Sequence, residues 1–122
     1  MNGMETQERT VPQIELRGLS KVYQIPGGEV VALNNISLSI DKGDIYGIIG
    51  MSGAGKSTLV RCINLLERPT DGQVLIDGQN VLAMSKKQLL QTRRRMAMIF
   101  QQFNLLMQKS VARNVRYPLE IA

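Results

Sequence analysis

The order of apolar and polar positions along the chain predicts strands and helices in alternation. A strand is expected over residues 30–40, within which Ile36, Leu38 and Ile40 alternate with Ser37 and Ser39, as is typical of a half-exposed antiparallel strand. A first strand is expected over residues 13–19, carried on by residues 21–24. Two further runs, residues 45–49 and 96–100, are apolar throughout, as in strands buried on both faces of a parallel sheet. The pattern therefore predicts an α/β fold with an antiparallel β layer packed on a core of parallel strands.

Three stretches are predicted to be helical. Residues 59–66 are apolar almost all round, which is typical of a buried helix. Ser85 and Ser110 are candidate N-caps, because a serine hydroxyl can accept a hydrogen bond from a free N–H of the first turn. The helix after Ser85 is expected to be short and polar. The helix after Ser110 is expected over residues 111–116, with Pro118 interrupting it.

A hairpin is predicted between the first two helices. Residues 73–76 form its first strand, Asp77 and Gly78 its turn, and residues 80–81 its return. An apolar strand that ends in aspartate also resembles the Mg²⁺-binding strand of phosphate-loop NTPases. The glycine that follows at once favours the turn, so Asp77 is predicted to be a turn residue and not a metal ligand.

Length and composition limit the classes of protein to which the chain can belong. Its 122 residues suffice for one modest domain, and no apolar run approaches the ~20 residues of a membrane span. Residues 1–12 carry no signal-peptide pattern and are expected to be a disordered leader before a domain over residues 13–122, in a cytoplasmic protein. Cys62 is the only cysteine, which excludes an internal disulfide, and its place in an apolar helix indicates packing.

The net charge of +5 is only a weak signal for nucleic-acid binding. Much of it comes from a group of basic residues around the predicted polar helix: Lys86, Lys87, Arg93, Arg94 and Arg95. No aromatic side chains are interleaved with them for base stacking, so a solvated helix face is favoured and no nucleic-acid partner is expected. The sequence contains no histidine, so any mechanism with a histidine base would need that residue from outside these positions.

Residues 50–58 carry the strongest chemical signal in the chain. Their sequence, GMSGAGKST, fits the phosphate-binding pattern G-x-x-x-x-G-K-[ST]. Glycines let the backbone curl so that its N–H groups converge on a phosphate, and the following helix points the positive end of its dipole there. Lys56 is expected to reach the β and γ phosphates, and the Ser57 hydroxyl to ligate Mg²⁺. The candidate nucleotide-binding residues of the loop are Gly50, Ser52, Gly53, Ala54, Gly55, Lys56, Ser57 and Thr58.

With this loop in place, the sequence from about Ile14 onward resembles the N-terminal half of an ABC transporter ATP-binding subunit. The resemblance rests on the loop, on Tyr23 and on Gln101 within the run IFQQFNLL over residues 99–106. It implies a phosphate-loop NTPase core that binds ATP, with Tyr23 stacked on the adenine. It also implies that Gln101 is a catalytic residue that contacts Mg²⁺ and the nucleophilic water. A glutamine suits that role because its amide oxygen can bind a hard cation and its nitrogen can orient a water.

The resemblance also indicates which motifs of the family are missing from this sequence. The family's L-S-G-G-Q signature, its strand ending in Asp-Glu, its aspartate-containing dimer loop and its switch histidine do not occur in the sequence. The helical subdomain and the C-terminal half of the domain are therefore expected to be absent, and the chain alone is expected to be inactive as an ATPase. The implied partners are a second ATPase subunit and a membrane permease subunit, which would hold it at the cytoplasmic face of the plasma membrane. By itself the chain is expected to be soluble in the cytoplasm.

Several segments are most similar to ATPases of methionine importers, namely residues 45–50, 61–70 and 114–120. The implied function is the ATP-binding part of an ABC importer ATPase that powers amino-acid uptake, with methionine as the solute and polar amino acids as the alternative. A truncated, non-catalytic nucleotide-binding fragment is a further alternative. A GTPase is disfavoured because the guanine-binding pattern N-K-x-D is missing, and a small-molecule kinase because no lid or substrate-binding segment is found.

Overall fold

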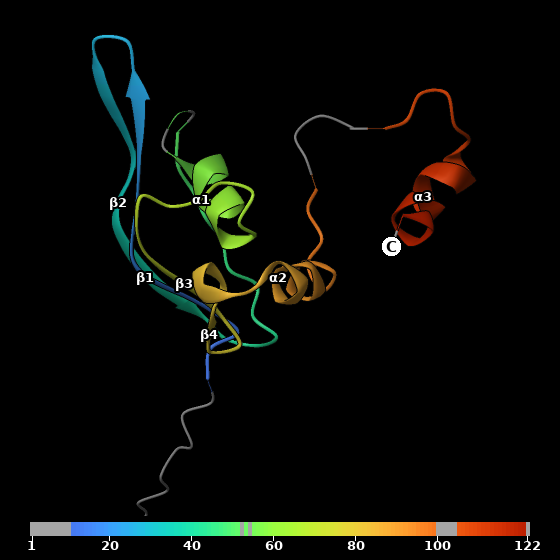
Figure 1. Ribbon diagram of the computed structural model, residues 1–122, viewed down its shortest axis with the longest axis horizontal. Helices are drawn as coiled ribbons and strands as arrows, with labels where there is room; N and C mark the ends of the chain where they lie inside the picture. Colours follow the sequence, from blue (N-terminus) through green and yellow to red (C-terminus); the bar gives the residue numbers. More distant parts are fainter. Residues whose placement is uncertain (1–10, 52, 54, 100–104, 122) are drawn as a thin grey trace, which may run out of the picture.

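The computed structural model describes residues 11–51, 53, 55–99 and 105–121. Within them the chain forms a small antiparallel sheet, three α-helices and one 3₁₀ helix (Figure 1). The predicted disordered leader over residues 1–12 lies outside the described residues except for its last two positions.

Four strands make up the sheet, in the order β2-β1-β3-β4, and every neighbouring pair is antiparallel. The antiparallel layer that the sequence predicts is therefore confirmed. The bounds of the strands are β1 Ile14–Ile25, β2 Gly28–Ile40, β3 Asp71–Ile76 and β4 Gln79–Asn80.

β1 and β2 form a long hairpin, and the two segments predicted for the first strand are one continuous strand (Figure 1). The alternation over residues 36–40 is confirmed, because its apolar side chains are half-buried and its serines are exposed. The pairing shifts register between Leu16 and Val22. Gly18 lies there with a φ of 57°, and its N–H donates to Ser37 Oγ at 2.9 Å. Such irregularities bend a strand and increase its twist, which lets the hairpin curve around the helix packed on it.

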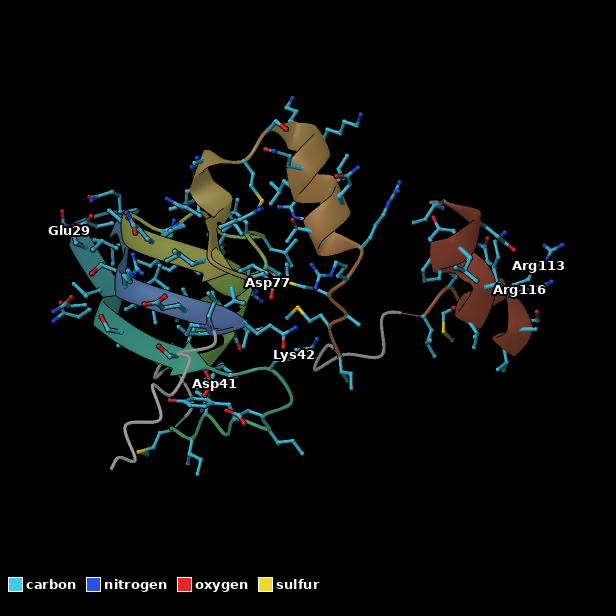
Figure 2. The ribbon with its side chains drawn as sticks, turned by 90° about the horizontal axis from the view of Figure 1, so that it is seen from below. Glu29, Asp41, Lys42, Asp77, Arg113 and Arg116 are labelled. Atoms are coloured by element: carbon cyan, nitrogen blue, oxygen red, sulfur yellow. The ribbon has the colours of Figure 1, made fainter. Side chains whose placement is uncertain are left out.

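β3 and β4 are joined by the predicted Asp77-Gly78 turn. Both residues have a positive φ, 50° for Asp77 and 80° for Gly78, as a type I′ turn requires. The prediction that Asp77 is a turn residue is therefore confirmed. Its carboxylate, labelled in Figure 2, pairs with the Arg95 guanidinium at 3.0 Å.

One helix, α1 (Lys56–Ile63), covers the sheet and closes the core. Leu59 and Cys62 are its buried residues, and Cys62 is completely inaccessible, which confirms its role in packing. The prediction of a helix through residue 66 that is buried almost all round is wrong. The helix ends at Ile63, and Leu66 is 58% exposed. The core consists of Leu16, Leu19, Leu33, Leu59, Cys62, Leu65, Val74, Ile76 and Val81.

The C-terminal end of α1 is closed by a Schellman motif. The N–H of Leu66 donates to Arg61 O at 2.8 Å, and the N–H of Leu65 donates to Cys62 O at 3.2 Å. Leu65 takes the left-handed conformation, with a φ of 58°, at a position where glycine is usual. Burial of its side chain in the core offsets the strain, which is about 1–2 kcal/mol for a residue that carries a Cβ.

The guanidinium of Arg93 completes this helix end. Arg93 is the last residue of α2 (Lys86–Arg93), and its Nε donates to Asn64 O at 3.1 Å while one Nη donates to Leu65 O at 2.6 Å. Carbonyls at a helix C-terminus have no intrahelical partner and carry partial negative charge, so a cation there is favourable. Arg93 is thus a structural contact between two helices, and only the rest of the basic group fits the predicted solvated face.

The prediction for α2 is confirmed at its start. Ser85 accepts a hydrogen bond from Gln88 N, and the Gln88 side chain accepts one from Ser85 N, which together form a capping box. A 3₁₀ helix, η1 (Val81–Ala83), links the β3-β4 hairpin to this helix. Its N-cap is Asn80, which ends the short return strand.

The prediction for the last helix, α3 (Val111–Glu120), is confirmed at its start and wrong at its end. Ser110 caps it as expected, but Pro118 lies inside the helix. A proline deprives only one carbonyl of its partner, and here it falls in the last turns, after which Ile121 N still donates to Tyr117 O at 3.1 Å. None of the residues of α3 is buried, and Figure 1 shows it apart from the sheet. No helix within the described ranges has the length and apolarity to cross a membrane.

The two runs predicted as buried parallel strands form no strand in the described part of the chain. Residues 45–49 pair with none of the described strands, and Ile45 and Ile49 are fully exposed. The same holds for residues 96–99, the described part of the second run, where Ile99 is fully exposed. A parallel strand is stable only between bonded neighbours with both faces covered, and the described sheet is antiparallel and bonds to neither run.

Replacing Arg93 with alanine should lower the free energy of unfolding by about 1–3 kcal/mol, because two carbonyls at the end of α1 lose a charged donor. Urea denaturation of the whole chain measures this. Arg94→Ala is the matched control: the neighbouring side chain is exposed, and its removal should change the stability by less than about 0.5 kcal/mol. Equal losses for the two variants would contradict a specific role for Arg93.

Candidate functional site

The glycine loop before α1 takes a backbone conformation that only glycine adopts readily. Gly53 and Gly55 have φ values of 83° and 92°, in the left-handed region. Gly55 also lies directly against β2: a Cβ built on it would stand 2.4 Å from Ala32 O and 3.2 Å from Leu33 Cδ2. The loop is thus fixed to the sheet at the point where the helix begins. Ser52 and Ala54, two of the predicted loop residues, lie outside the described residues.

Lys56 is the first residue of α1, and its side chain folds back over the loop. Its Nζ donates to Gly50 O and, at 2.9 Å, to Met51 O, which are the first two carbonyls of the loop. An ammonium has three N–H donors, so one remains after these two bonds. The two carbonyls hold the ammonium over the loop. A phosphate bound by the loop would therefore lie next to this positive charge.

The N-terminus of α1 has no side-chain cap. Gly55 is the N-cap and has no side chain to accept a hydrogen bond, and the first turn contains no acidic residue. The partial positive charge of the free N–H groups is therefore not neutralised by the described residues, as in helix ends that bind anions. Ser57 is exposed and Thr58 half-buried in the same turn.

The β1-β2 hairpin brings Tyr23 to the face of the sheet on which α1 lies. Lys21 is paired with Leu33, and paired residues of an antiparallel sheet point to the same side. Leu33 contacts the Gly55 position, so this side is the α1 side. Tyr23 is two residues further along β1 and shares that side. The ammonium of Lys21 lies 5.2 Å from the centroid of the Tyr23 ring, which confirms that the two side chains are neighbours.

The remaining predicted site residue, Gln101, lies outside the described residues. Among the residues that the structure does describe, no three His, Cys, Asp or Glu side chains come close enough to hold a metal ion. The described residues therefore place the loop at the start of α1 and put Tyr23 on the same side of the sheet, and Gln101 is not among them.

Two contacts beyond the C-terminal end of α1 were not found from the sequence. Lys21 donates to Arg68 O at 2.7 Å, and Arg93 donates to Leu65 O at 2.6 Å. Both join residues distant in the sequence, and no local pattern marks either one. Burial raises the pKa of the Cys62 thiol, while the charge of Lys21 opposes this rise and that of Glu67 adds to it.

A glycine loop that opens a helix, with a lysine folded back over the loop, defines the phosphate-loop class of nucleotide-binding folds. Residues 33–121 match the family model described as ABC transporter. That match covers more than half of the chain, and the chain belongs to the ABC transporter family.

Curated relatives with high identity are methionine import ATP-binding proteins. The chain is 58% identical over 109 residues to the protein MetN of Myxococcus xanthus, and 55% identical over 109 residues to MetN of Symbiobacterium thermophilum. Each alignment covers 89% of this chain and 33% of the relative. The chain thus spans about one third of the length of the curated relatives that it matches.

A solved structure with the same fold is an ATP-binding cassette in a dimeric post-hydrolysis state bound to ADP and Pi. Its TM-score is 0.80 at 35% sequence identity, and the match covers 88% of this chain and 47% of the cassette. A second dimeric structure of that cassette matches with a TM-score of 0.77. The predicted fold class, a phosphate-loop NTPase core with an antiparallel β layer of which this chain is an incomplete part, is confirmed.

Gly55→Ala should destabilise the chain by about 3 kcal/mol or more, because the new Cβ meets the Ala32 carbonyl as well as a positive φ. Gly43→Ala is the control. Gly43 has a φ of 87° with open space around it, so this variant keeps the backbone strain without the clash and should lose only about 1–2 kcal/mol. Thermal or urea unfolding compares them. A smaller loss at position 55 than at position 43 would refute the close packing of the loop on β2.

Proposed function

We propose that residues 13–122 are the N-terminal part of an ABC ATP-binding domain and bind ATP for an importer ATPase that powers methionine uptake. The observation that carries the proposal is the position of Lys56, bonded to the Gly50 and Met51 carbonyls at the uncapped start of α1. A fixed cation and a free helix N-terminus at one loop suit a polyphosphate better than any other common ligand.

In this proposal the residues of the loop bind the phosphates of ATP. The left-handed conformations at Gly53 and Gly55 allow N–H groups of the loop to converge on one point. The third donor of Lys56 is directed to the β and γ phosphates, and the N–H groups of the first turn, including those of Ser57 and Thr58, approach the phosphate from the helix. Gly50, Ser52 and Ala54 complete the loop as expected from the sequence.

Mg²⁺ fits the donors that the chain offers. Mg²⁺ keeps several waters and takes its other ligands from phosphates and one or two protein oxygens, so it does not need the cluster of acidic side chains that the described residues lack. The exposed Ser57 hydroxyl, in the first turn of α1, is one such oxygen, and the Gln101 amide is the second in this proposal. Bound Mg²⁺ would neutralise charge on the β and γ phosphates.

Tyr23 is the proposed platform for the adenine ring. It is half-buried on the side of the sheet that carries α1, so part of its aromatic surface is accessible on that side. Stacking of a base on an aromatic side chain contributes about 1–3 kcal/mol to nucleic-acid binding, and we expect a similar contribution here.

The solute and the partners rest on the relatives. Those with 50–58% identity are named as methionine import ATP-binding proteins, and the solved cassette is a dimer. We therefore propose methionine as the solute, a second ATPase subunit as one partner and a membrane permease as the other, with the ATPase peripheral on the cytoplasmic face. Gln101 would then take part in hydrolysis in the assembled transporter. An importer of polar amino acids is the alternative that the uptake experiment below separates.

Lys56→Ala should weaken the binding of Mg-ATP by about 10- to 100-fold, because the phosphates lose a charge-assisted hydrogen bond. Titration with a fluorescent ATP analogue measures the affinity. Lys42→Ala is the control: Lys42 is exposed in the turn after β2, labelled in Figure 2, and its removal should leave the affinity unchanged. Equal affinities of the wild type and the Lys56 variant would exclude the phosphate-loop function.

Methionine uptake tests the solute. Deletion of the gene that encodes this chain should abolish high-affinity uptake of labelled methionine, and a copy with Lys56→Ala should fail to restore it, whereas a copy with Lys42→Ala should restore it. Glutamine and arginine uptake should be unaffected. Normal methionine uptake together with a loss of glutamine or arginine uptake would replace the methionine proposal with the polar amino-acid alternative.

A further inference from the structure

The side chain of Lys21 is held by three contacts at once. Its Nζ donates to Arg68 O at 2.7 Å, lies 3.6 Å from the Glu67 carboxylate and lies 5.2 Å from the centroid of the Tyr23 ring. The side chain is only 17% exposed. A lysine on a strand usually extends into water, because its flexible stem loses rotamer entropy when it is fixed. Here the cation has one defined position over an aromatic face.

The contacts of Lys21 connect the aromatic ring to the far end of the loop helix. Glu67 follows the terminus of α1, and its N–H donates to Arg61 O at 3.1 Å, so it is attached to the last turn of that helix. The next segment bonds to β1 on both sides of Lys21: Thr70 N donates to Ser20 O at 2.8 Å, and Val22 N donates to Thr70 Oγ1 at 3.0 Å. The start of α1 carries the loop and its end carries the anchor of Lys21, so one rigid helix joins the two.

We propose that Lys21 is a positioning residue for nucleotide binding, which fixes the plane of the Tyr23 ring and its distance from the phosphate loop. The proposal rests on the proposed function, in which Tyr23 receives the base. The ammonium occupies one face of the ring, and a cation over an aromatic face is an attractive contact. A base then stacks on the other face, and a ring already held in place loses less conformational freedom on binding.

The proposal makes a distinction between ligands with and without a base. Lys21→Met keeps the length and packing of the stem but removes the charge. It should weaken the binding of Mg-ATP by about three- to tenfold, the range expected for a partly desolvated cation–π contact, and leave the binding of inorganic tripolyphosphate within about twofold. Lys21→Arg keeps a cation over the ring and should bind ATP within about twofold of the wild type. Glu67→Gln removes the carboxylate that pairs with Lys21. It should also weaken the binding of Mg-ATP more than that of tripolyphosphate, by a smaller factor than Lys21→Met.

A double-mutant cycle with Tyr23→Ala separates this role from a purely structural one. In the Tyr23→Ala background, Lys21→Met should cause no further loss of ATP affinity, because there is no ring left to position. An equal loss for ATP and tripolyphosphate, or the same loss in the Tyr23→Ala background, would overturn the proposal and assign Lys21 to the fold alone. An unchanged ATP affinity in Lys21→Met would overturn it as well, with the proposed function intact. A wild-type chain that binds neither ligand would remove the proposed function and this inference together.

Discussion

The close packing of the loop on β2 at Gly55 is the constraint on which the candidate site depends. The Ala32 carbonyl leaves no room for a side chain at Gly55, so the start of α1 lies directly against the β1-β2 hairpin. This contact sets the position of the uncapped helix end and of Lys56, whose charge lies over the loop. The same hairpin carries Tyr23 on the same side. The phosphate-binding loop and the aromatic ring thereby lie on the same side of one hairpin.

The other end of α1 is held just as firmly, by contacts of a different kind. A Schellman motif turns the chain at Leu65, and Arg93 from α2 binds the last carbonyls. Lys21 from β1 binds the carbonyl of Arg68 just beyond them. The Arg93 cation thus lies at the negative end of the helix dipole, while the positive end points at the loop. A short helix of eight residues, marginal by itself, is stabilised in this way at its C-terminal end.

The described sheet accounts for only part of the apolar surface of the chain. Ile45, Ile49 and Ile99 are fully exposed, and α3 buries none of its residues. The chain spans about a third of its curated relatives and less than half of the solved cassette that it matches, which is consistent with apolar segments that lack bonded neighbours among the described residues. The buried core between α1 and the sheet is nevertheless continuous, with Leu16, Leu19 and Cys62 almost completely inaccessible.

The sequence by itself determined the features that depend on neighbouring residues. The turn at Asp77-Gly78, the N-cap at Ser85 and the alternation over residues 36–40 of β2 were predictable because a few adjacent side chains decide each one. The same holds for the loop before Lys56, whose glycines and lysine lie within one short segment. For Pro118 the local rule failed, since a proline near the end of a helix costs a single hydrogen bond.

Only the tertiary structure decided the features that join distant segments. The bonds from Lys21 to Arg68 and from Arg93 to Leu65 link residues 47 and 28 positions apart, and burial of the Leu65 side chain in the core offsets the strain of the turn that follows α1. Residues 45–49 are the converse case, in which a local pattern predicts a strand that the described structure does not contain. Their composition is that of a buried strand, but a strand forms only when a neighbouring strand bonds its backbone, and no strand of the described sheet does so. Local propensity therefore specified the turns and caps. Long-range packing decided where α1 ends, which segments become strands, and where the side chains of Lys21 and Arg93 bind.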